Sequence, residues 1–168
     1  MSAASMNDGN ASGALEDADA RQFLTFRLAG EEYGVGILTV QEIRGWSSVT
    51  KVPHTPDWLL GVINLRGVVV PIIDLRIKFN FASAEYNDTT VVIILNVATR
   101  VVGVVVDAVS DVITLGSGEI KPAPSLGNGA ETGHIIGFGT LDERMRILMD
   151  VEKLMAGADM GLVDKAVH

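Results

Sequence analysis

The sequence predicts a mainly β protein, and three observations support this. Hydrophobic residues make up 48% of the 168 residues but aromatic residues only 5%, so the core must consist mainly of Val, Ile and Leu. Many of these are β-branched, and β-branched side chains suit pleated strands better than helices. Strand-like segments joined by short polar turns recur along the chain. Two of these segments are nearly uninterrupted apolar runs, which is typical of strands buried on both faces.

The chain begins with small, polar and acidic residues, and we expect residues 1–20 to form a disordered acidic tail. This tail lacks the positive charges and the apolar stretch of a secretory signal. Order is expected to begin with a hairpin. Residues 22–28 alternate as in a strand, the polar sequence AGEE turns the chain, and residues 33–37 form the returning strand.

A second hairpin is predicted within residues 61–76, after two short segments. The sequence ILTVQEI has apolar residues at positions 37, 40 and 43, which fits either a short helix or an irregular strand. In TPDWLLG, Pro56 and Asp57 suit the start of a helix and Gly61 suits its end, so one short helical turn is expected there. GVINLRGVVVPIIDLR then predicts two apolar strands joined by a turn at residues 64–67.

Two more hairpins and a helix complete the pattern. TVVIILNVATRVVGVVVDAV predicts strands around an ATR turn, and HIIGFGTLDERMRILMDV predicts strands around an LDER turn. Residues 116–133, rich in Gly, Pro and Ser, predict a long loop between them. Residues 150–167 predict a C-terminal helix with Leu154, Met155, Leu162 and Val163 as its apolar stripe. Four hairpins in about 130 ordered residues indicate two small barrels or one larger sandwich.

Charge and composition exclude several classes of function. The net charge is −8 and no basic stripe is present, so nucleic acid is not an expected partner. The chain has no cysteine, which excludes disulfides and thiolate metal sites. Its apolar runs are far shorter than the roughly 18 residues of a membrane helix, so no direct membrane insertion is expected. Together these features favour a soluble cytoplasmic protein.

The sequence contains no convincing catalytic or cofactor site. The three histidines do not form an H-E-x-x-H pair, and no G-x-S-x-G motif is present. GNGAETG differs from a phosphate-binding loop in spacing and lacks a following lysine. We therefore expect no enzymatic activity, no metal and no cofactor. The alternative is an enzyme or ligand-binding barrel, which would need an ordered cavity holding Asp107 or His134.

With no catalyst expected, interaction becomes the favoured function, and Arg66 is the clearest contact candidate. It interrupts two apolar strands at a tight turn, where an arginine either meets water or binds a partner. A guanidinium on a rigid hairpin offers two parallel hydrogen bonds to a carboxylate. Two other readings stay open: a plain turn residue, and an arginine that holds two barrels together through an internal carboxylate.

Five blocks of the chain, spanning about residues 21–165, resemble the bacterial chemotaxis coupling proteins of the CheW family. The blocks are FLTFRLAGEEYGVGILTVQEIRG, GVINLRGVVVPIIDLRIKF, YNDTTVVIILNV, RVVGVVVDAVSDV and RMRILMDVEKL. The G-V-x-N-L-R-G block followed by P-I-x-D-L-R is the most diagnostic part. Because several long blocks occur in the expected order and spacing, the resemblance is highly specific.

The resemblance implies two small SH3-like β-barrel subdomains packed together, with short helices and a C-terminal helix. The first subdomain is expected to contain approximately residues 21–68 and 134–165, and the second approximately residues 69–133. The implied function is a non-enzymatic adaptor. It would connect the cytoplasmic tips of methyl-accepting chemoreceptors to the regulatory domain of the histidine kinase CheA, and would support array assembly at the inner membrane. A second reading is an adaptor domain of larger design, as in couplers fused to a receiver domain or in the kinase's own regulatory domain. We do not expect it, because the chain ends at His168 with no room for a receiver domain.

The resemblance also implies two contact surfaces. A groove between the barrels is expected to receive a receptor helix hairpin. The matching positions are Val40, Glu42, Arg66, Thr90, Val91 and Val112. The KPAPSL loop is expected to contact the kinase through Lys121, Ser125 and Leu126.

Overall fold

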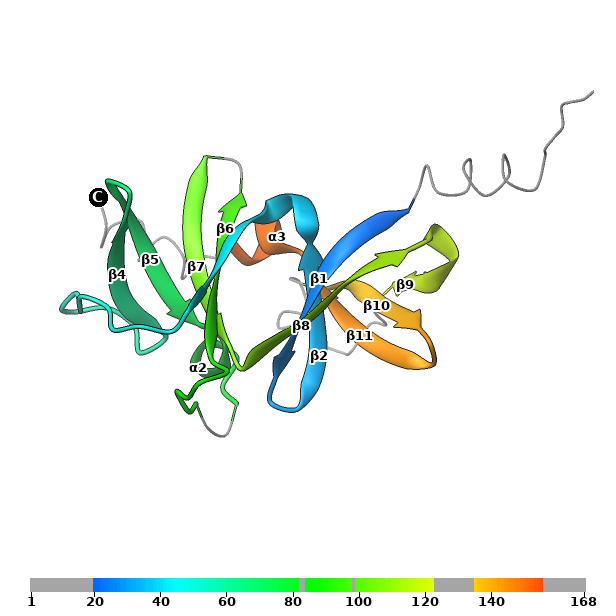
Figure 1. The fold of residues 1–168 in the computed structure, drawn as a ribbon, viewed down its shortest axis with the longest axis horizontal. Helices are drawn as coiled ribbons and strands as arrows, with labels where there is room; N and C mark the ends of the chain where they lie inside the picture. The colour runs from blue at the N-terminus through cyan, green and yellow to red at the C-terminus, as the bar shows by residue number, and fades with distance from the viewer. Residues whose placement is uncertain (1–19, 82–83, 98, 123–134, 156–168) are drawn as a thin grey trace, which may run out of the picture.

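The computed structural model describes residues 20–81, 84–97, 99–122 and 135–155. The described residues form two β-sheets, one of six and one of five strands, with only short helical segments (Figure 1). This confirms the predicted mainly β class. The expected acidic tail falls almost wholly on residues 1–19, which lie outside the described ranges.

The six-stranded sheet has the order β8-β1-β2-β11-β10-β9. All neighbouring strands are antiparallel except β11 and β2, which run parallel. This parallel pair joins strands that lie far apart in the sequence. Its strands are β1 (Arg21–Leu28), β2 (Glu31–Gly36), β8 (Ala108–Leu115), β9 (Ile120–Pro122), β10 (Ile135–Leu141) and β11 (Arg144–Met149).

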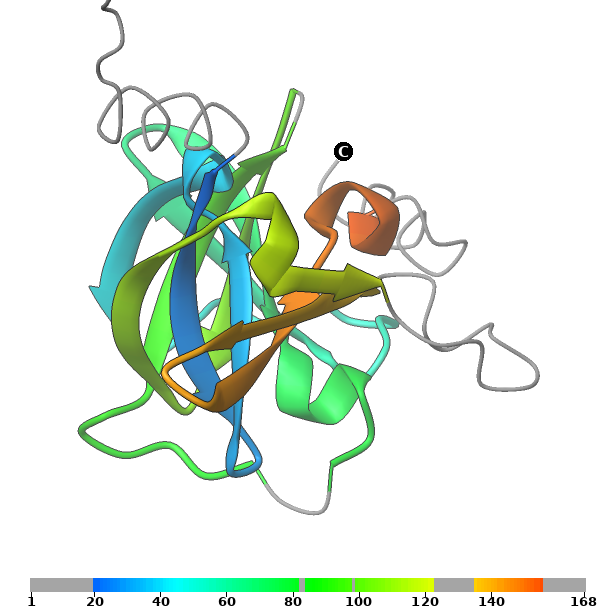
Figure 2. The same cartoon turned by 90° about the vertical axis from the view of Figure 1, so that its right-hand side faces the viewer.

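The five-stranded sheet has the order β3-β6-β7-β5-β4. Its strands are β3 (Val40–Gly45), β4 (Leu59–Leu65), β5 (Val68–Asp74), β6 (Val91–Val97) and β7 (Arg100–Val106). The helical segments are η3 (Ile37–Thr39), α2 (Leu75–Lys78), η4 (Ser117–Glu119) and α3 (Val151–Met155). Figure 2 shows the six-stranded sheet in front of the five-stranded one.

All four predicted hairpins are confirmed, as the pairs β1–β2, β4–β5, β6–β7 and β10–β11. The turn between β4 and β5 is the predicted one. Arg66 and Gly67 have φ angles of 52° and 88°, the signs required at both central residues of a type I′ turn. The Gly67 amide donates to the Asn64 side chain at 2.9 Å, which fixes this tight turn.

Several local predictions need correction. The helical turn expected in TPDWLLG is wrong, because the hydrogen bond from the Leu59 amide to the Pro56 carbonyl (3.1 Å) closes a simple turn and β4 starts at once. For residues 37–43 the sequence left a short helix and an irregular strand open, and both occur: the short helical segment η3 is followed by strand β3. The long loop expected from residue 116 is partly wrong, since η4 and β9 occupy its first residues.

Helix α3 confirms the start of the predicted C-terminal helix. Val151, Leu154 and Met155 are buried against the core, and the Arg100 guanidinium donates to the Met155 carbonyl at 3.1 Å. In Figure 1 this helix lies between the two sheets. The predicted stripe residues Leu162 and Val163 lie outside the described ranges.

The subdomain boundaries expected from the sequence do not match the membership of the sheets. A boundary at residue 68 would separate β4 from β5, yet these strands form one hairpin. Strands β3 and β4 belong to the five-stranded sheet, whereas β8 and β9 belong to the six-stranded sheet. Chain order misled the prediction because the chain crosses between sheets twice, at η3 and again at Asp107.

The five-stranded sheet curls so that its two edges meet. The strand pairs among the described residues do not make a continuous barrel, but a bridge joins Thr50, downstream of β3, to Val62 of β4. Its two hydrogen bonds measure 2.9 and 2.8 Å. At neighbouring Gly61 a Cβ atom would lie 2.2 Å from the Thr50 carbonyl oxygen, so this contact requires glycine. The curled sheets fit the predicted SH3-like subdomains.

The buried apolar residues that the structure describes form three clusters. The largest lies between the two sheets and includes Phe26 of β1 and Ile93 of β6. The other two lie inside the five-stranded and the six-stranded subdomains. Alternate residues of β6 enter different clusters, Ile93 between the sheets and Ile94 inside the five-stranded subdomain. This double burial explains the nearly uninterrupted apolar run of β6.

Candidate functional site

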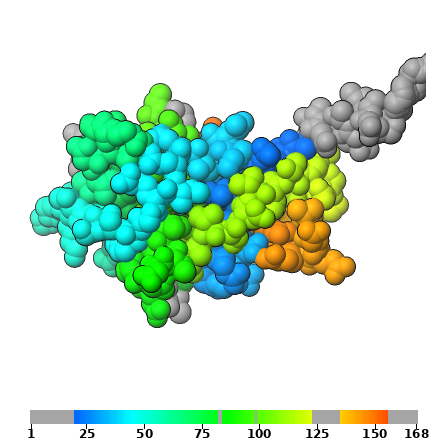
Figure 3. Space-filling model, viewed as in Figure 1, coloured from blue at the N-terminus to red at the C-terminus, as the bar shows by residue number. Residues whose placement is uncertain are grey.

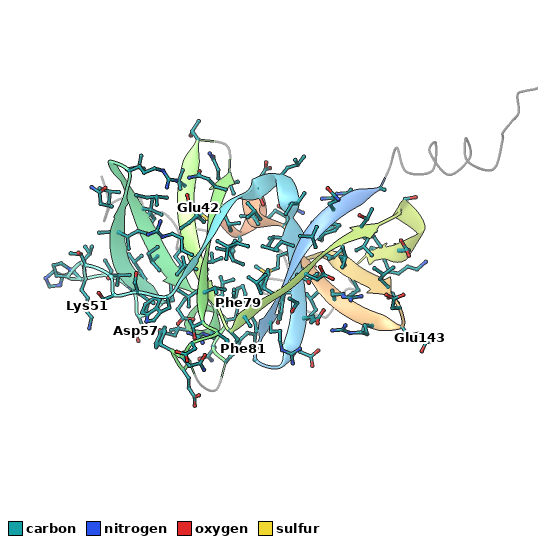
Figure 4. All side chains as sticks on the ribbon, in the orientation of Figure 1. Glu42, Lys51, Asp57, Phe79, Phe81 and Glu143 are labelled. Atoms are coloured by element: carbon teal, nitrogen blue, oxygen red, sulfur yellow. The ribbon has the colours of Figure 1, made fainter. Side chains whose placement is uncertain are left out.

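The candidate site centres on an ion pair between Glu42 and Arg66. Glu42 lies on β3 and Arg66 follows β4, and these are the two outer strands of the five-stranded sheet. The pair therefore joins the two edges of the curled sheet at its surface. Figure 4 shows Glu42 beside the strands of this sheet. Arg44, also on β3, donates to the same carboxylate at 3.3 Å.

The two arginines favour the ionised form of Glu42. The hydrogen bond from Arg66 is the main reason why the pKa of Glu42 lies below its ordinary value, and the bond from Arg44 adds to it. The Arg66 side chain is 64% exposed and that of Glu42 is 26% exposed. The guanidinium thus keeps much of its surface open to water while one of its nitrogens is already hydrogen-bonded.

This geometry removes one of the readings of Arg66 left open by the sequence, the arginine that holds two barrels together. Its partner Glu42 belongs to the same sheet, so the ion pair closes one subdomain and does not hold the two subdomains together. The turn residue is exposed and oriented by a carboxylate, as a contact residue on a rigid hairpin would be.

The three valines predicted at the same surface lie on strands of both sheets. Val40 on β3 and Val91 on β6 are half-buried and pack against the cluster between the sheets. Val112 on β8 is 46% exposed. β3 and β8 are edge strands of different sheets, and Figure 3 shows their surfaces adjoining on the viewed face. Exposed apolar side chains of Leu38 and Ile43 lie in η3 and β3 beside these positions.

Thr90 differs from the other predicted contact residues because it is buried, with only 1% of its surface exposed. Its hydroxyl accepts a hydrogen bond from the Asn87 amide at 2.9 Å. Its carbonyl accepts one from the Trp46 amide at 3.2 Å. The side chain therefore organises the loop before β6 and presents no contact surface of its own.

Of the three predicted kinase contacts, one can be placed. Lys121 is exposed on the short strand β9, at the edge of the six-stranded sheet. Ser125 and Leu126 lie outside the described ranges.

Sequence reasoning missed a buried polar cluster around Arg76. Arg76 and Asp74 are 2% and 0% exposed. The guanidinium makes two hydrogen bonds to the Asp74 carboxylate, at 3.0 and 2.9 Å, and one to Asp107 at 2.8 Å. Tyr86 donates its hydroxyl to Asp74 at 2.6 Å. The signal was present in the D-L-R sequence, because two charges directly after a buried strand require partners.

The cluster keeps Arg76 charged and engages the carboxylate of Asp107. Burial alone would lower the pKa of Arg76, but the hydrogen bonds to Asp74 and Asp107 raise it overall. Both carboxylate oxygens of Asp107 are engaged, by Arg76 and by the Ala29 amide at 2.9 Å. This arrangement gives no support to the alternative of a catalytic Asp107, and His134 lies outside the described ranges.

In the part of the chain that the structure describes, no group of three or more His, Cys, Asp or Glu residues is arranged to hold a metal ion. Over the same residues, no helix has the length and apolar character needed to cross a membrane.

Comparison with known proteins decides the family. Residues 22–159 match the CheW-like domain. The chain belongs to the CheW family. It is 54% identical over 144 residues to the chemotaxis protein CheW of Klebsiella aerogenes, a match that covers 86% of this chain and 87% of that protein. It is 40% identical over 136 residues to a probable CheW of Rhizobium etli, covering 81% and 88%.

A solved structure supports the same assignment. The scaffolding protein TtCheW from Thermoanaerobacter tengcongensis superimposes with a TM-score of 0.76 at 32% identity, covering 83% of this chain and 94% of that one. The expected two-subdomain CheW fold is confirmed. The CheW family comprises chemotaxis scaffold proteins and not enzymes, so this chain is an adaptor of that family.

Proposed function

We propose that this CheW-family chain couples the cytoplasmic tips of methyl-accepting chemoreceptors to the histidine kinase CheA, supports activation of the kinase, and helps to assemble the array. It would act in the cytoplasm and reach the inner membrane only through the receptors, without inserting itself. Family membership supports the adaptor role. The observation that carries the proposed receptor contact is the exposed, carboxylate-oriented Arg66 at the joined edges of the five-stranded sheet.

The receptor surface would be formed by β3, the β4–β5 turn and β8. Val40, Val91 and Val112 would supply apolar contact, while Glu42 and Arg66 would supply the charged rim. A helix hairpin suits such a surface, because amphipathic helices bind through a central apolar stripe with polar groups at the margin. Buried Thr90 would act indirectly, by holding the start of β6.

The kinase surface would lie elsewhere, at the end of the six-stranded sheet that carries β9. Lys121 is exposed there, and Ser125 and Leu126 follow in the sequence. The kinase's regulatory domain would pack against this region barrel to barrel. Separate surfaces would let one chain bind receptor and kinase at the same time.

Reconstituted kinase autophosphorylation tests the proposal. Kinase, receptor-bearing membranes and this protein are combined, with wild type or Arg66→Ala. Wild type should activate the kinase strongly, whereas Arg66→Ala should lose roughly tenfold or more, the effect of losing one charge-assisted contact. Direct kinase binding by the variant should persist. A folded wild type that fails to activate a matched kinase would contradict the proposal.

Leu126→Asp tests the division between the two surfaces. A charge at an apolar contact should weaken association with the kinase more than association with receptors. Co-sedimentation with receptor membranes and a direct kinase titration measure the two separately. Equal losses in both assays would contradict separate surfaces.

A further inference from the structure

We infer that Tyr86 and Asp107 are positioning residues that hold the strands of the proposed receptor surface, β3, β6 and β8, in one fixed arrangement. This inference rests on the proposed function and adds to it, since neither residue is among the proposed contacts. The relevant group, called here the Tyr86 cluster, consists of Trp46, Asp74, Arg76, Tyr86 and Asp107.

Tyr86 links the end of β3 to the buried charges. Its ring stacks on the Trp46 indole, with centroids 4.6 Å apart, and the Arg76 guanidinium lies 4.9 Å from the ring centroid. Trp46 directly follows Gly45, the last residue of β3. The Tyr86 hydroxyl donates to Asp74 at 2.6 Å, so a ring stack, a cation–π contact and a hydrogen bond together fix this side chain.

Asp107 links the same charges to the other sheet. It lies between β7 of the five-stranded sheet and β8 of the six-stranded sheet. One carboxylate oxygen accepts from Arg76 at 2.8 Å and the other from the Ala29 amide, in the β1–β2 turn, at 2.9 Å. Its own amide donates to the Arg27 carbonyl at 3.0 Å. One residue therefore contacts both sheets at the point where the chain crosses.

The start of β6 is attached to the same cluster. The Glu85 carbonyl accepts from Arg76 at 2.7 Å, and the Thr89 hydroxyl donates to the Asp107 carbonyl at 3.0 Å. Trp46 donates its amide to Thr90, which precedes β6. The end of β3 and the starts of β6 and β8 thus share one set of contacts. Arg76 itself lies in α2, the short helix that directly follows β5.

A cluster with these contacts sets the relation between the two sheets as well as their stability. Arg76 and Asp74 are buried and cannot meet a receptor helix directly. A receptor surface made of strands from two sheets binds a rigid helix pair only if those strands keep their spacing. Small changes at Tyr86 or Asp107 should therefore alter binding at positions that they do not touch.

Spin-label distances combined with the kinase assay test this inference. The chain has no cysteine, so two introduced cysteines are the only sites that a thiol-reactive spin label can modify. They are Gln41→Cys on β3 and Thr114→Cys on β8, both at exposed positions. The distance distribution is measured in this background with wild type, Tyr86→Phe and Asp107→Asn. Tyr33→Phe is the matched control, because it removes the other tyrosine hydroxyl, on β2 and outside the cluster.

The expected result separates positioning from a loss of folding. Tyr86→Phe and Asp107→Asn should broaden the β3–β8 distance distribution and reduce receptor-dependent kinase activation about tenfold. Direct kinase binding should stay within about twofold. Tyr33→Phe should leave all three readouts as in wild type.

Two results would overturn the inference. One is an unchanged distance distribution in both cluster variants. The other is a parallel loss of melting temperature, kinase binding and activation, which would show a role in stability alone. If wild type itself fails to activate the kinase, the proposed function fails. The distance distributions still decide whether the cluster positions β3 against β8.

Discussion

Two arginines on either side of β5 meet opposite environments. Arg66, before the strand, is 64% exposed and pairs with Glu42 at the surface. Arg76, after the strand, is 2% exposed and binds two carboxylates. Exposed ion pairs contribute little to stability because water solvates the separated charges almost as well. A buried charge that loses its partner has no such substitute. Arg66 is thus available for partners, whereas Arg76 is committed to the fold.

The largest expected effect comes from removing the buried arginine. Arg76→Met should lower the free energy of unfolding by about 3–5 kcal/mol, because Asp74 would stay buried without its counterion. Chemical denaturation measures this loss. Arg44→Met makes the same chemical change on exposed β3 and serves as the control. If both variants lose equal stability, the contrast between buried and exposed pairs is wrong.

Thr90→Val should have an intermediate effect. The substitution keeps the shape but removes the buried Thr90 hydroxyl and the hydrogen bond that it accepts from the Asn87 amide, at a cost of about 1 kcal/mol. Denaturation of this variant is compared with Thr114→Val, at an exposed position of β8. Should Thr90→Val reduce receptor coupling with no loss of stability, Thr90 would be a contact residue after all.

Arg66→Ala should change stability least among these substitutions while it changes coupling most. The melting temperature is expected to stay within about 2 °C of wild type, because the ion pair is exposed.

A charge reversal, Glu42→Arg with Arg66→Glu, tests the pair itself. Recovery of fold and stability without recovery of receptor coupling would assign the arginine to the partner. A large drop in melting temperature for Arg66→Ala would make it structural.

A tyrosine titration probes the Tyr86 cluster with the smallest expected effect on the fold. Burial and the hydrogen bond to Asp74 raise the pKa of Tyr86 to about 12. Because the folded pKa lies above the ordinary value of 10.0, the resulting stabilisation is complete below pH 10 and is lost as the pH rises through 12. Ultraviolet absorbance follows the ionisation, and Tyr86→Phe should remove the later step. Ionisation of Tyr86 at its ordinary pKa would contradict the hydrogen bond.

Local patterns determined much of the fold. The four hairpins were readable because apolar alternation and turn residues act over a few neighbouring positions, as in the Arg66–Gly67 turn. The apolar run of β6 correctly indicated burial on both faces. Strand β8 was not predicted as a separate strand, because its exposed residues Asp111 and Thr114 gave it a weak signal.

The candidate site was less accessible to local reasoning. The resemblance supplied the contact positions, but not that Thr90 is buried or that Glu42 is the partner of Arg66. The Tyr86 cluster was visible in the sequence only through the D-L-R motif that contains Asp74 and Arg76. Two further members, Tyr86 and Asp107, come from distant segments that no spacing rule connects.

The sequence by itself determined the mainly β class, the hairpins and the family, since each depends on residue types in a local order. Only the tertiary structure decided which strands share a sheet, that β3 and β4 meet through Thr50 and Val62, and which charges are buried. These features depend on contacts between residues far apart in the chain. Arg66 and Arg76 are the same residue type, and burial alone makes one a candidate contact and the other part of the core.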